Sequence, residues 1–128
     1  MPKLRYAHAC DVEAMAKDIV EKLDMKWIRL EHVRFIRSTG SKSSATARIY
    51  GLPKSFQVAF NLPPLYVIEV ISEKFDVLPA EKQVEVLVHE LLHIPKSFSG
   101  GLRPHGKAVN SRVVRRLTEK YLSTLARR

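Results

Sequence analysis

The stretch VEVLVHELLH, residues 84–93, predicts a buried α-helix with two histidines on one face. Its apolar residues occupy most sides of the helix, which is typical of a helix packed inside a fold. His89 and His93 are four residues apart, so their side chains stand one above the other. Two imidazoles placed in this way can bind one Zn²⁺, and Glu90 beside the first can accept a proton from a water that the metal activates.

The alternative is that the two histidines are ordinary side chains of the core or surface, because five positions with three fixed residues also arise by chance. The surroundings of Glu90 favour the metal. A carboxylate in so apolar a helix is costly unless it has a partner, and a metal-bound water supplies one. We therefore expect one Zn²⁺ per chain.

A catalytic zinc needs a third protein ligand and an open position. His105 follows His93 by twelve residues, beyond a Gly-Gly pair that can turn the chain back, and is expected to open the last helix. Glu119 is the competitor, because some zincins take a glutamate from a following helix. It is fourteen residues further on, or about 21 Å along a helix, so both cannot bind one ion. We favour His105.

The remaining segments predict an α+β fold in a single domain, residues 1–128. An amphipathic helix with Asp11 as its N-cap precedes a small, mostly antiparallel sheet, and a hairpin is expected around the polar loop at 38–44. Pro95 should end the motif helix. The expected elements are a helix over 11–24, strands over 27–37, 45–50, 57–60 and 65–71, the motif helix over 79–93 and a last helix over 105–125.

Positive charge is concentrated in two segments of the chain. The net charge is +9, and residues 94–128 carry nine Lys/Arg against one acid, while residues 26–54 carry seven against one. Such clustering is typical of a surface that meets an anionic partner, most often nucleic acid. The candidate phosphate-binding residues point outward from the last helix: Arg112, Arg115, Arg116 and Lys120. The alternative is a solvated basic face without a partner.

Cysteine usage and hydropathy indicate a cytoplasmic protein. Cys10 is the only cysteine, which excludes an internal disulfide and fits a reducing compartment. No apolar run approaches the ~20 residues of a membrane helix, and the N-terminus leads into no signal-peptide core. We expect no membrane contact.

The motif and its continuation resemble known metallopeptidases. His89-Glu90-Leu91-Leu92-His93 followed by His105-Gly106 resembles the SprT-like zincins, and Ile94-Pro95 with the Gly-Gly loop is more similar to the small metallopeptidases of phage and archaeal genomes. The resemblance covers about residues 65–118. It implies a zincin-like fold, zinc at the three histidines, and Glu90 as the general base of peptide hydrolysis.

The expected function is therefore that of a zinc-dependent metallopeptidase acting on a protein or peptide substrate. A further hypothesis combines this activity with nucleic-acid binding, so that nucleic acid brings the peptidase to its protein substrates. The strand at 65–71, just before the motif helix, is expected to be an edge that aligns the substrate. The alternative is a nucleic-acid-binding module with a structural or non-catalytic zinc. The number of ligands separates the two, because a fourth protein ligand would close the site.

Overall fold

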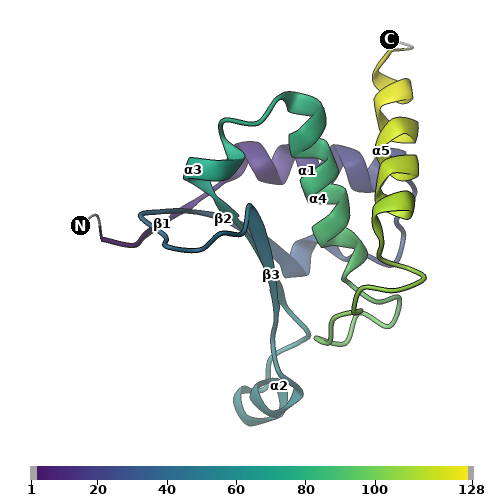
Figure 1. Ribbon diagram of the computed structural model, residues 1–128. Coiled ribbons are helices and arrows are strands. Elements are labelled where there is room, and N and C mark those ends of the chain that lie inside the picture. Colours follow the sequence, from purple (N-terminus) through teal and green to yellow (C-terminus); the bar gives the residue numbers. More distant parts are fainter. Residues whose placement is uncertain (1–2, 127–128) are drawn as a thin grey trace.

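The computed structural model describes residues 3–126 and contains a four-stranded mixed sheet with helices packed against one face (Figure 1). The class is α+β, as predicted. In chain order the elements are β1 (Arg5–His8), α1 (Cys10–Lys22), a 3-10 turn (Leu30–His32), β2 (Val33–Thr39), β3 (Ala47–Gly51), α2 (Lys54–Phe60), β4 (Tyr66–Ile71), α3 (Ser72–Phe75), α4 (Ala80–Leu92) and α5 (Ser111–Ala126).

The strand order is β1-β2-β4-β3, and it corrects two predictions about the sheet. The central pair β2 and β4 is parallel, while both outer pairs are antiparallel, so the sheet is mixed rather than mostly antiparallel. The expected hairpin is absent, because β4 lies between β2 and β3. The reason is visible in the composition of β4, YVIEVI, a nearly continuous apolar run that is almost wholly buried and therefore takes a central place.

The segment expected as a short strand over 57–60 is instead part of α2. Pro53 precedes this helix, and Asn61 ends it with a positive φ of 54°, a conformation that asparagine tolerates at helix ends. A short apolar run cannot be assigned to strand or helix by its periodicity alone. Figure 1 shows α2 projecting from the rest of the chain, and its Phe56, Val58 and Phe60 are exposed.

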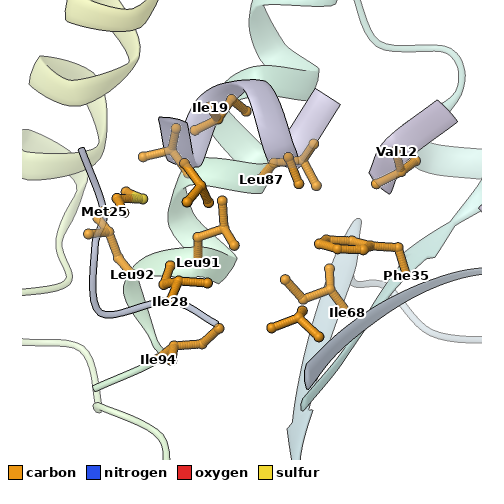
Figure 2. Packing of buried hydrophobic residues seen from close by; sticks show 14 of the residues in the cluster. Val12, Ile19, Met25, Ile28, Phe35, Ile68, Leu87, Leu91, Leu92 and Ile94 are labelled. Carbon is orange, nitrogen blue, oxygen red and sulfur yellow. The ribbon is translucent and has the colours of Figure 1, made fainter. Parts of the chain in front are cut away.

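The core lies between α1, α4, α5 and one face of the sheet (Figure 2). Burial of each Leu or Ile stabilises the fold by about 1.5–3 kcal/mol, so α4 is held firmly by its apolar side. The contacts that fix α4 to α1 and the sheet include Val12, Ile19, Phe35, Ile68, Leu87 and Leu91.

Helix α1 starts one residue earlier than predicted, and Asp11 is not its N-cap. The cap position is Ala9, and the Asp11 carboxylate in the first turn pairs with Arg37 of β2 at 2.9 Å. An aspartate engaged by a cation on a neighbouring strand is not available to cap its own helix. Among the described helices, none is long and apolar enough to cross a membrane.

Candidate metal centre

The motif residues His89 and His93 lie on α4 as the spacing predicted. The helix begins after Pro79 and ends at Leu92, with His93 as its C-cap, two residues before Pro95. The two imidazole rings are half-buried, and their centroids are 4.9 Å apart. The C-terminal end of α4 therefore presents two ring systems side by side at the edge of the core.

The loop between α4 and α5 brings His105 to the same place. Its Nε2 atom lies 2.9 Å from Nε2 of His89, and the candidate ligand atoms of all three histidines lie within 4.8 Å of one another. Glu119, the competing ligand, is exposed on α5 and does not join this group.

His105 does not open a helix, contrary to the prediction. It lies in a bend six residues before Ser111, where α5 begins. The reason is an unrecognised cap: the backbone N–H of Val113 donates to Oδ1 of Asn110 at 3.0 Å, so Asn110 starts the helix.

Arg103 fixes the imidazole of His93. Nδ1 of His93 lies 2.6 Å from the carbonyl oxygen of Arg103, and because a carbonyl can only accept, Nδ1 carries the proton. The lone pair is then on Nε2, free to bind a metal, which is the usual role of such a second contact. The Arg103 guanidinium donates to the Leu92 carbonyl and lies over the Trp27 ring, 5.8 Å from its centroid. The Nε1–H of Trp27 donates to the Ile94 carbonyl.

The middle of the same loop is tied to the sheet and to α2. The Tyr66 hydroxyl accepts a hydrogen bond from the Gly100 N–H and donates to the Gly101 carbonyl, both at 2.8 Å. The side-chain amide of buried Gln57 donates to the Leu52 carbonyl after β3 and to the Ser99 carbonyl in the loop. A side chain at Gly51 would stand 1.9 Å from the Gly100 oxygen, so two glycines allow the backbones to meet.

Glu90 is buried, with 6% of its surface exposed, and within residues 3–126 its carboxylate makes no hydrogen bond or ion pair. Burial raises the pKa of Glu90 to about 7. The pKa of His89 is lowered, chiefly by burial and further by the neighbouring His93 and His105. The site thus favours a neutral imidazole at His89, the form that binds metals, next to a carboxyl group that can gain or lose a proton. These donors fit a zinc ion.

The four predicted phosphate-binding residues lie on one exposed face of α5. Their spacing of three, four and eight residues places them along that face, and in the described part of the chain none forms a salt bridge. The opposite face buries Val114, Thr118 and Tyr121. The basic residues are Arg112, Arg115, Arg116 and Lys120.

A comparison with models of protein families identifies a related family. The family model described as "Putative phage metallopeptidase" matches residues 4–128. No curated protein and no solved structure shows significant similarity to the chain. The match runs from β1 to α5, so it covers the whole sheet and all three histidines rather than the HExxH helix alone. The chain belongs to this phage metallopeptidase family, and a metal ion is implied by that membership.

Proposed function

We propose that the protein is a zinc-dependent peptidase in which His89, His93 and His105 hold one zinc ion and Glu90 is the general base. The observation that carries this proposal is the convergence of three imidazoles whose ligand atoms lie within 4.8 Å of one another. Three protein ligands are typical of catalytic zinc, whereas structural zinc usually has four. Among the described residues, no fourth His, Cys, Asp or Glu joins the group. The likeness to SprT-like zincins remains an inference from the motif.

The residues of the chain divide the chemistry between them. When bound, zinc would polarise a peptide carbonyl and lower the pKa of a water molecule. Glu90 would accept a proton at a carboxylate oxygen and then release it to the leaving amine. Arg103 would keep His93 in the tautomer whose Nε2 is unprotonated.

The strand that aligns the substrate is β3 in this proposal, not the strand at 65–71. The edge prediction for that strand was wrong, because β4 is paired on both sides. Among the described strands, β3 pairs with β4 alone, and it packs against the motif helix α4. The free edge of β3 offers backbone N–H and C=O groups with which an extended peptide can pair.

Replacement of Glu90 tests the proposal. Glu90→Gln should keep about one zinc per chain and an unchanged melting temperature, but lose at least about 100-fold in hydrolysis of a denatured fluorescent protein, because the amide cannot accept a proton. Glu81→Gln, an exposed change in the first turn of the same helix, is the matched control and should keep full activity. Undiminished turnover by Glu90→Gln would exclude the general-base role.

A second candidate function is nucleic-acid binding by the exposed face of α5. The observation in its favour is that four cations share this face and that none of them forms a salt bridge within the described residues. Contacts of these cations with phosphates would release counterions, so affinity should fall steeply with salt and depend little on base sequence.

Fluorescence anisotropy with short single- and double-stranded DNA, between about 50 and 200 mM salt, tests this second function. Arg116→Gln should weaken binding and reduce the salt slope by about 1. Lys17→Gln removes the same charge from an exposed site on α1 and is the control. Negligible binding at low salt would leave a peptidase without a nucleic-acid partner.

A further inference from the structure

We propose that a cavity between α4 and α5 selects a large apolar side chain next to the scissile bond, a specificity that rests on the proposed peptidase function. The cavity has a volume of about 480 Å³. Its apolar walls are Leu78, Val86 and Val114, and two of its other walls are His89 and His105.

The position of the cavity identifies its occupant as part of the substrate. His89 and His105 face each other at 2.9 Å between their Nε2 atoms, and both belong to the candidate metal centre. A group inside the cavity is therefore flanked by the same two rings that are proposed to hold the metal. In a peptide substrate, only a side chain close to the scissile bond can occupy that position.

The walls favour an uncharged occupant. Val86 lies one turn before His89 on α4, and Val114, in the first turn of α5, is 5% exposed. The two charged residues of the wall, Lys82 and Glu85, are partly exposed and already paired with each other, with Nζ of Lys82 3.3 Å from the Glu85 carboxylate. A carboxylate or ammonium entering this space would lose its water without gaining a free partner, which is costly.

The volume favours a large occupant over a small one. A cavity of about 480 Å³ lies in the ~300–1,000 Å³ range of sites that enclose small organic groups. One methylene group in an apolar pocket changes specificity by roughly 10–200-fold. Leucine, methionine or phenylalanine should therefore exceed alanine by at least about tenfold in kcat/KM, and aspartate or lysine by more.

Cleavage-site profiling by mass spectrometry on a denatured protein mixture tests the preference. The unaltered zinc-loaded protein should enrich large apolar residues at one of the two positions that flank the cleaved bonds. Val86→Phe fills part of the cavity and should shift the profile towards small residues. Val58→Phe, which makes the same change at an exposed position of α2, should leave it unchanged. A profile without apolar enrichment, or one that Val86→Phe does not move, would overturn the inference.

A binding experiment separates failure of this inference from failure of the proposed function. The zinc-loaded Glu90→Gln protein with labelled methyl groups is titrated with L-phenylalaninamide or L-alaninamide. The phenylalanine probe should produce saturable NMR shifts at Leu78, Val86 and Val114 and not at Val58, and the alanine probe should not. Such binding without hydrolysis by the unaltered protein would remove the peptidase but keep the apolar site. Hydrolysis with no shift at these methyl groups would remove the inference alone.

Discussion

Of the two candidates for the third metal ligand, His105 lies at the site and Glu119 does not. The ring nitrogen of His105 lies 2.9 Å from that of His89 because the chain between residues 93 and 105 turns back on itself. Glu119 is on the exposed face of α5, in a helix whose start is fixed by Asn110. The loop position of His105 therefore does not prevent it from being a ligand.

At this residue scale we predict that His105→Ala weakens zinc binding by more than about 100-fold, since loss of even an outer-shell partner of a ligand costs roughly 10–100-fold. Glu119→Ala is the control and should bind zinc within about twofold of the unaltered protein. Competition with a chromophoric chelator measures both affinities. The ligand assignment would be wrong if Glu119→Ala were the variant that lost its zinc.

The elements that the sequence predicted best are those whose periodicity is strong. The motif helix, the helix near residues 11–24 and the strand near 65–71 were all found, because their apolar spacing needs no knowledge of partners. The pairing of β3 was missed because it depends on where β4 lies. The bend at His105 was missed because Asn110, not His105, caps α5. The path of the loop between α4 and α5, which carries His105, could not be predicted. Tyr66 and Gln57, which hold this loop in place, are far from it in the sequence.

At the scale of elements, the junction between this loop and β3 gives a matched pair of glycine predictions. Gly100 has a φ of 101°, and a Cβ there would lie 2.4 Å from the Leu52 carbonyl oxygen. Gly100→Ala should therefore destabilise the protein by about 1–3 kcal/mol and weaken zinc binding by displacing the loop. Gly101→Ala meets no atom within 4 Å and should change neither. Urea unfolding and zinc titration of both variants check this, and equal effects would contradict it.

At the scale of the whole molecule, Arg37 of β2 joins α1 to the segment after α3. Its guanidinium lies 2.9 Å from the Asp11 carboxylate and 2.8 Å from that of Asp76. The hydrogen bond from Arg37 lowers the pKa of Asp11. Burial would raise the pKa of Asp76, but hydrogen bonds from Arg37 and Ser72 outweigh it and lower that pKa as well.

A depressed pKa in the folded state means that these ion pairs stabilise the fold above the unfolded pKa of about 3.9, and that this stability is lost as the pH falls through the lower folded values. Arg37→Gln should thus be less stable than the unaltered protein at pH 7, by at most about 1 kcal/mol per pair because the carboxylates are partly exposed. Below about pH 4 the difference should shrink. Arg34→Gln, which loses only bonds to backbone carbonyls, should show a difference that does not vary with pH. Urea unfolding at pH 7 and pH 3 measures both.

Two hydrogen bonds join His93 to Arg103: the Nδ1–H of His93 donates to the Arg103 carbonyl, and the Arg103 N–H donates to the His93 carbonyl. They reduce the chain entropy that a bound metal ion would otherwise remove. An ion that joined His93 to His105 would be a cross-link closing a ring of thirteen residues, and chain-entropy models assign about 3 kcal/mol to a ring of roughly fifteen. Much of this entropy is given up without the ion, because one backbone hydrogen bond and one from the His93 imidazole already hold residue 103 to residue 93. The metal would bind to a loop that is already partly ordered by these hydrogen bonds. Its removal should leave the protein folded, unlike a zinc finger, whose chain must be gathered by the ion itself.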